Sequence, residues 1–348
     1  SGTVTGLAVG GLPDGTVDAG TLATDSVTAA KIAANSVDSA ELVDGAVDDS
    51  HMASISGRKN ILINGGFEIA QRGTTISGIG SAKYTLDRWN AISSGADSTV
   101  TQVSGATYPK ALRLTGAGST SGTYLQQKIE STNSRHLAGQ TATFSVYLRA
   151  STAINIEFSI KYATSADNFG GTTSIASTTF NVTTTDTKFT WTGSIPSAAT
   201  TGIQVELKIS SQGSAWYEAS NAQLELGSTA TDFEHRSYGE ELTLCQRYFQ
   251  RYQAEQQEWL YNEGNAAHGK WWQLVYSEMR AGPTVTFDSG WTGGGAAGLS
   301  GTVTAISASS NPYRLSARVT FSATGGSAYN VHHTDSFNGS YCYLDAEL

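Results

Sequence analysis

Hydrophobic and polar positions follow one pattern before about residue 57 and another pattern after it. Between residues 16 and 53, single apolar residues recur at every fifth position. A step of five matches neither the helical period of 3.6 nor the strand period of two, so one chain cannot gather these residues on one regular face. The apolar positions are Val17, Leu22, Val27, Ile32, Val37, Leu42, Val47 and Met52.

The residues between these apolar positions are mostly Ala, Ser, Thr, Asp and Gly, which are too small and polar to cover a core. A repeat that cannot bury its own apolar side chains needs neighbours, either from its own chain or from other copies. One thin row of apolar residues suits several parallel copies around a common axis. We therefore predict that residues 1–57 are a shaft that makes the chain a homotrimer, with these apolar positions as the contacts.

From residue 60 to about 235, apolar and polar residues alternate, which is typical of half-buried strands. The segment 60–73 predicts a short strand, a Gly-Gly turn and a second strand. About eight strands joined by Gly-, Ser- and Thr-rich loops predict an antiparallel β-sandwich of the jelly-roll type over residues 58–236. The clearest strands are predicted at 111–116, 124–130, 142–150, 154–163, 188–195, 202–210 and 222–227.

A linking helix is predicted within residues 237–255, with Ser237 as its N-cap. Leu242, Cys245 and Phe249 are spaced by three and four positions, like a short heptad seam. Two placements of this seam stay open: against neighbouring copies on the trimer axis, or on the chain's own sandwich. After the helix, alternation returns, and residues 256–348 predict a small C-terminal β tip domain with a Gly-rich loop at 291–300.

Composition supports a mainly β fold after the shaft, because Gly, Ser, Thr and aromatic residues are frequent there and Pro is rare. The formal net charge is −9, and residues 1–57 carry −7 of it through eight acidic residues and one Lys. A weakly acidic chain without a basic stripe argues against nucleic acid as a partner. No stretch is apolar and long enough to predict membrane insertion.

Two further features of the sequence bear on its context. With Cys245 and Cys342 as its two cysteines, the chain is not a disulfide scaffold, and one bridge between them stays open. Because the chain begins with Ser rather than Met, we expect it to be a fragment that lacks an upstream attachment segment.

Several segments, in their order along the chain, resemble parts of bacteriophage tail-fibre and receptor-binding proteins. The shaft repeat is similar to repeats in the necks of phage fibres. Segments 64–68, 71–73 and 84–89 (NGGFE, QRG and YTLDRW) resemble the start of carbohydrate-binding jelly rolls in phages. Segments 223–227, 230–234 and 241–249 resemble the end of that domain and the helix after it, and segments 278–285 and 344–348 resemble a tip domain.

This resemblance implies a homotrimeric virion protein of the phage tail, located outside the cell. It implies attachment to a bacterial surface glycan, and contacts with other tail proteins through the N-terminus. Related sugar-binding jelly rolls carry a structural calcium near such an Asn-Gly-Gly-Phe-Glu turn, which implies Glu68 as a ligand here. No second acidic residue stands at a matching position, so the residues themselves support no metal site.

Glycan binding needs aromatic faces for the C–H groups of the sugar and polar groups for its hydroxyls. Trp89 and Trp191 are assigned to the core, whereas aromatic residues at strand ends and in loops are candidate contacts. A metal site at the adjacent pair 332–333 is disfavoured, because neighbouring side chains of a strand point apart. The candidate ligand-binding residues are Trp216, Tyr217, Trp271, Trp291, Tyr313, Tyr329, His332 and His333.

Two other functions stay open: a depolymerase that cuts surface polysaccharide, and a bacterial surface adhesin. Hydrolysis of a glycan needs two carboxylates that face one groove, and acidic residues such as Glu157 and Glu206 stand singly on predicted strands. The sequence contains no nucleophile elbow, zinc motif or phosphate-binding loop. We therefore expect a structural and binding protein without catalytic residues.

The five-residue step predicts the oligomeric state. Light scattering of the full chain is expected to give three times the monomer mass, and removal of residues 1–57 is expected to weaken this association. The double variant Ile32→Asp/Val37→Asp should loosen the shaft, because it places charges in the apolar row. Thr28→Asp/Ser39→Asp adds the same charge between the apolar positions and should leave the trimer intact. A monomeric full chain would refute the prediction.

Overall fold

The structure is a computed structural model that describes residues 59–253, 259–260, 267–275, 277–287, 292–295, 299–311, 314–323, 332–333 and 341–348, with side chains for 59–252, 277–286 and 341–348. The chain divides into two units, residues 1–57 and 58–348. The predicted shaft and its eight apolar contacts lie outside the described residues, so the homotrimer stays a prediction.

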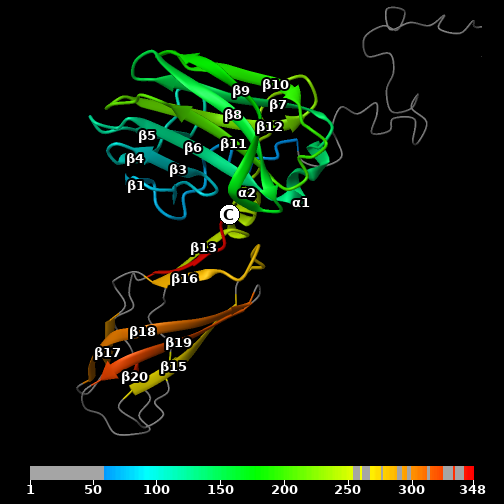
Figure 1. Ribbon diagram of the computed structural model, residues 1–348. Coiled ribbons are helices and arrows are strands. Elements are labelled where there is room, and N and C mark those ends of the chain that lie inside the picture. Colours follow the sequence, from blue (N-terminus) through cyan, green and yellow to red (C-terminus); the bar gives the residue numbers. More distant parts are fainter. Residues whose placement is uncertain are drawn as a thin grey trace, which may run out of the picture. The chain divides into compact units, whose positions relative to one another are not determined.

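Two six-stranded antiparallel sheets form the layers of a β-sandwich (Figure 1), which confirms the predicted mainly β fold. Sheet I has the order β1 (Thr75–Ile79), β4 (Ser98–Val103), β5 (Ala111–Thr115), β12 (Trp216–Leu226), β7 (Thr141–Ala150) and β10 (Thr187–Ser194). Sheet II has the order β2 (Lys83–Tyr84), β3 (Asn90–Ser94), β6 (Gly122–Ile129), β11 (Ile203–Ile209), β8 (Ile154–Ser165) and β9 (Asn168–Val182).

The core between the two sheets is built from the alternate apolar residues of the strands. Phe144 of β7 stacks on Phe158 of β8, with ring centroids 4.3 Å apart, and this contact joins the layers. Trp89 is 1% exposed, which confirms its assignment to the core, and Trp191 is partly buried against the same cluster. Burial of these large side chains supplies the main driving force for packing the sheets.

The seven clearest predicted strands correspond to β5, β6, β7, β8, β10, β11 and β12. The sequence of β9 does not show the alternation of apolar and polar residues that predicts a strand, because NFGGTTSIASTTFNV is mostly Gly, Ser and Thr. It forms by pairing along β8 in a long antiparallel hairpin. Cross-strand pairing therefore decides the state of this segment, and its own pattern does not.

The prediction of two strands within residues 60–73 is wrong, because this segment is an irregular loop. Its apolar side chains Leu62, Phe67 and Ile69 are nevertheless fully buried. Asn64 organises the loop: it adopts a left-handed φ of 56°, and its side chain accepts from the backbone nitrogen of Ile69 at 3.0 Å and donates to the Asp87 carbonyl at 3.0 Å. Apolar residues here indicate burial without a strand.

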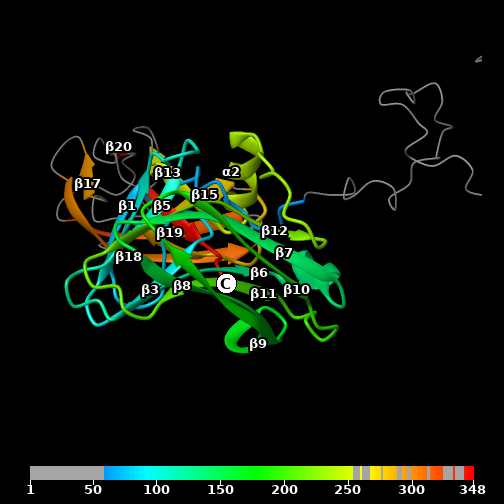
Figure 2. The ribbon, with the colours of Figure 1, turned by 90° about the horizontal axis from the view of Figure 1, so that it is seen from above.

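The helix α2 spans Tyr238–Gln246, and Ser237 caps it by accepting from the backbone nitrogen of Glu240 at 3.4 Å. The predicted heptad seam is wrong, because Phe249 lies on strand β13 and no longer continues the helix. Cys245 and Phe249 are buried within this chain, and Leu242 is half-buried. Figure 2 shows α2 at the margin of the sandwich. In the described part of the chain, no helix is both long and apolar enough to cross a membrane.

Short helical turns α1 (Ser131–Ser134) and η2 (Arg135–Leu137) follow β6. After α2, strand β13 (Phe249–Gln253) joins β21 (Tyr341–Asp345) and β16 (Thr284–Phe287) in one antiparallel sheet. A second sheet has the order β15 (Ala267–Val275), β19 (Arg314–Ala323), β18 (Leu299–Asn311) and β17 (Thr292–Gly295), and β14 (Trp259–Leu260) pairs with β20 (His332–His333). The predicted Gly-rich loop at 291–300 thus contains a strand.

Residues 341–348 return to the sandwich, although their sequence predicts part of a separate tip. Glu347 pairs with the buried Arg88 and, at 3.4 Å, with Arg72. The guanidinium of Arg88 also lies 3.5 Å from the ring centre of Tyr248, the residue before β13. Both described cysteines, in α2 and β21, are buried free thiols, so no bridge joins them.

Close backbone approach explains the first glycine of the Gly-Gly sequence in the loop 60–73. A Cβ atom at Gly65 would lie 2.1 Å from the carbonyl oxygen of Ala222. We expect Gly65→Ala to lower the free energy of unfolding by about 1–3 kcal/mol through this overlap. The matched control is Gly118→Ala, where nothing lies within 4 Å of the added atom. Thermal unfolding of both variants tests this, and equal effects would contradict it.

Candidate functional site

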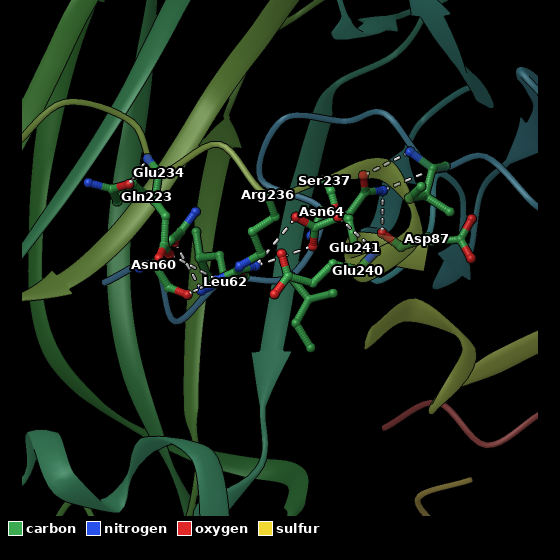
Figure 3. Close-up of polar contacts among 12 residues, drawn as sticks. Asn60, Leu62, Asn64, Asp87, Gln223, Glu234, Arg236, Ser237, Glu240 and Glu241 are labelled. Atoms are coloured by element: carbon green, nitrogen blue, oxygen red, sulfur yellow. Dashed lines mark hydrogen bonds and ion pairs between the residues drawn. The ribbon is translucent and has the colours of Figure 1, made fainter. Parts of the chain in front are cut away.

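Arg236 joins the start of the sandwich, the segment after β12, and α2 (Figure 3). Its guanidinium donates to the carbonyl oxygen of Leu62 at 3.0 Å and to that of Asn60, and pairs with Glu241 of α2 at 3.2 Å. Glu241 in turn accepts from the backbone nitrogen of Asn64 at 2.6 Å. Because the Arg236 side chain is only 3% exposed, these protein groups replace water around its two terminal nitrogens, whereas its Nε has no hydrogen-bond partner among the described residues.

Outward side chains of β12 fold the next segment, residues 228–236, back over the outer face of sheet I. Glu225 accepts from the backbone nitrogen and the hydroxyl of Thr231, at 2.9 and 2.6 Å. Gln223 accepts from the backbone nitrogen of Glu234 at 2.8 Å. The segment 223–227 thus supplies the hydrogen bonds that hold the segment 230–234 in place.

A pocket of about 240 Å³ lies on this outer face, between the returning segment and the loop that joins β4 to β5. Ser145 and Tyr147 of β7 and Lys188 of β10 contribute strand positions that alternate with core residues. The residues that line the pocket are Tyr108, Ser145, Tyr147, Lys188, Asn221, Asp232, Phe233 and His235.

Two aromatic pairs stand at this pocket. The rings of Tyr108 and Tyr147 meet edge to face with centroids 4.8 Å apart, and those of Phe233 and His235 do so at 4.9 Å. Burial and the neighbouring Tyr147 hydroxyl raise the pKa of Tyr108 to about 12, so the phenol stays protonated at neutral pH. The pocket therefore offers neutral aromatic faces together with hydroxyl groups.

Asn221 supplies a polar group that the fold leaves without a partner. It lies in a bulge of β12, where the pairing with β7 shifts between Ser220 and Gln223, and has a left-handed φ of 47°. The residue is 4% exposed, and its amide nitrogen has no hydrogen-bond partner among the described residues. A buried amide without a partner costs free energy, and strained residues of this kind cluster at functional sites.

The structure separates the two adjacent candidates on β12. Trp216 is half-buried on the outer face of sheet I, with the Arg113 guanidinium 4.4 Å from its ring centre. Tyr217 faces the core and is fully buried, so its prediction as a ligand contact is wrong. Alternation along the strand forces this difference.

The other candidates lie in parts of the chain whose side chains are outside the described residues. Trp271 lies in β15, and His332 and His333 form β20, but their side chains are outside the described residues. Trp291, Tyr313 and Tyr329 lie outside the described residues altogether. Sequence reasoning missed Tyr108, Tyr147 and Asn221; the alternation of β7 could have revealed the outward Tyr147, whereas nothing local marks the bulge at Asn221.

The residues near Glu68 do not fit the calcium ion that the resemblance implies. The side-chain amide of Gln102 donates to the carbonyl oxygens of Phe67 and Glu68, at 2.7 and 3.0 Å. The carbonyl oxygens of Asn60 and Leu62 accept hydrogen bonds from Arg236. Calcium needs six to eight oxygen ligands. In the described residues, no group of three or more His, Cys, Asp or Glu side chains is placed to hold a metal ion.

No protein-family model matches the chain, and no curated protein matches it. Among solved structures, it is similar to the enzymatically active domain of tailspike protein 4 of bacteriophage CBA120, at 16% identity and a TM-score of 0.35; the match covers 48% of this chain and 21% of that one.

Two further matches are smaller domains. The CBM22-1 xylan-binding domain of Paenibacillus barcinonensis Xyn10C is 13% identical, with a TM-score of 0.32 over 50% of this chain and all of that one. TmCBM61, in complex with β-1,4-galactotriose, is 12% identical, with a TM-score of 0.28 over 49% of this chain and all of that one. At these scores the likeness carries no argument about function.

Because Arg236 occupies the centre of this contact network, we expect Arg236→Met to destabilise the sandwich by about 3 kcal/mol, since it leaves the Glu241 carboxylate without its cation and two carbonyl groups without their donor. Arg135→Met removes an exposed arginine and should have little effect. Thermal unfolding of the wild type and both variants measures the effect of each substitution on stability. The same measurement with a calcium chelator tests whether the stability of the wild type depends on a bound calcium ion. A large loss of stability on chelation would contradict the conclusion that the residues near Glu68 do not fit a calcium ion.

Proposed function

We propose that the pocket on the outer face of sheet I binds a glycan. The observation that carries this proposal is the combination, in one pocket of about 240 Å³, of two aromatic pairs with the unpartnered amide of Asn221. A sugar ring presents apolar C–H faces and several hydroxyl groups, so its recognition needs both kinds of group together.

The arrangement of the pocket favours binding by a preformed site. Tyr147 and Ser145 stand on β7, which is paired on both sides in sheet I, and Phe233 stands in a segment fixed by Glu225 and Arg236. Side chains on such supports lose little freedom when a ligand binds, which favours affinity. The amide nitrogen of Asn221, which has no hydrogen-bond partner among the described residues, would donate to a hydroxyl group of the bound sugar.

The proposal is for binding without cleavage. Within the described part of the chain, Asp232 is the one carboxyl group that lines the pocket, whereas glycoside hydrolysis generally uses two. A depolymerase is therefore the second candidate in our proposal, and an adhesin of the bacterial surface is the third.

The biological setting in this proposal is a phage tail fibre. The resemblance of the sequence and the five-residue repeat support a homotrimer that joins other tail proteins through its N-terminus and displays its glycan sites outside the cell. Three weak sites on one fibre raise the overall affinity for a repetitive bacterial surface by avidity. Neither nucleic acid nor membrane lipid is the partner in this proposal.

The pocket is tested on a glycan array with the full chain. Tyr147→Ala is expected to weaken binding at least tenfold, because it removes a central aromatic contact. Asn221→Asp keeps the shape but replaces a donor by an acceptor, and should also weaken binding. The matched control is Tyr124→Ala on the outer face of sheet II, which removes the same ring elsewhere.

The outcomes separate the candidate functions. Unchanged glycan binding by Tyr147→Ala would contradict this site. Release of sugar fragments from a bound polysaccharide over hours would favour the depolymerase over the binding protein.

A further inference from the structure

We infer that a cluster beside the pocket, formed by Arg113, Arg149, Glu218 and Trp216, is a second subsite that takes an acidic group of the same glycan. The ligand would be an acidic polysaccharide with a carboxylate or phosphate substituent. This inference rests on the proposed function, because it concerns the next part of the bound chain.

The two arginines and the glutamate form one row across three neighbouring strands of sheet I. Glu218 of β12 is paired with Arg113 of β5 on one side and with Arg149 of β7 on the other. Arg113 donates through Nε and Nη2 to one carboxylate oxygen at 2.9 and 2.5 Å, and Arg149 donates through Nε to the other oxygen at 2.5 Å. The carboxylate therefore fixes both guanidinium groups.

The charges in this row do not balance. Two guanidinium groups share one carboxylate, and in the described part of the chain neither arginine pairs with another acid. The Glu218 side chain is 3% exposed, whereas those of Arg113 and Arg149 are 33% and 26% exposed. The Glu218 carboxylate is therefore buried beneath the two guanidinium groups, which reach solvent. The row presents a net positive charge, whereas the chain as a whole has a formal net charge of −9.

Donor groups also remain available in this row. Neither terminal nitrogen of Arg149 hydrogen-bonds a described residue, and the same holds for Nη1 of Arg113. A planar guanidinium with two free donors matches a carboxylate or phosphate in bidentate geometry. The ring of Trp216 lies 4.4 Å from the Arg113 guanidinium and 5.7 Å from that of Arg149, which limits their movement.

The position of the row connects it to the pocket. Arg149 is two residues from Tyr147 on β7, so the two side chains share the outer face about 7 Å apart. A glycan held at Tyr147 and extended along β7 would bring its next units over the arginines and Trp216. The structure thus places the aromatic pocket and the cationic row on one face of sheet I.

The test uses the full chain and an array of glycan pairs with a common backbone: uronic acid polymers with their methyl esters, and phosphorylated polysaccharides with their dephosphorylated forms. The wild type is expected to bind an acidic member at least tenfold more tightly than its neutral partner, and added salt should reduce the difference. Arg149→Gln should weaken acidic binding about tenfold and remove the preference.

Further variants distinguish a direct effect on binding from an effect of lost folding. Arg149→Lys keeps the positive charge but loses the planar, bidentate guanidinium. Its affinity for the acidic glycan should lie between those of the wild type and Arg149→Gln. Lys83→Gln removes an exposed positive charge on β2 and is the charge control. Unchanged thermal unfolding of each variant establishes that the fold is intact.

The outcomes distinguish the two proposals. Binding that depends on Tyr147 but shows no acidic preference, or acidic binding that is unchanged in Arg149→Gln, would overturn this inference alone. A wild-type chain that binds no member of the array, acidic or neutral, would overturn the proposed function and this inference together.

Discussion

The buried guanidinium of Arg236 is the contact on which the candidate site depends. A charge with so little exposure is tolerated only when hydrogen bonds and opposite charges surround it. Glu241 and the carbonyl groups of the loop 60–73 provide these partners. Together with the hydrogen bonds that Thr231 donates to Glu225, Arg236 fixes the segment 228–236 at two points. The pocket residues Asp232 and Phe233 lie between those points, so their position follows from a contact made outside the pocket.

Much of the sandwich could be predicted from the sequence, because a strand with one buried face must alternate. The failures occur where burial or pairing has another cause. In the loop 60–73, Leu62 and Phe67 are buried while side-chain bonds from Asn64 replace the ladder bonds of a strand. At the end of α2, Phe249 leaves the helical pattern because β13 pairs with β21, far along the chain. No window of local sequence contains that partner.

The candidate site was less predictable than the fold, again for physical reasons. Alternation places Tyr147 outward from the same pattern that places Phe144 inward, so this residue was within reach of sequence reasoning. The amide of Asn221 was not, because a bulge has no reliable sequence signal and it shifts the pairing around it. The choice between Trp216 and Tyr217 needed the phase of β12, which the neighbouring strands set.

The contact between Glu347 and Arg88 has a consequence for how the protein is made. These residues are separated by 259 positions, and Arg88 is buried in the sandwich. During synthesis, all twelve sandwich strands leave the ribosome well before the acid that neutralises this arginine. The sandwich of a nascent chain therefore holds a cation without its partner until translation reaches residue 347. The last contact of this buried arginine is in this way coupled to synthesis of residues 341–348, and a chain that ends before residue 347 lacks the ion pair.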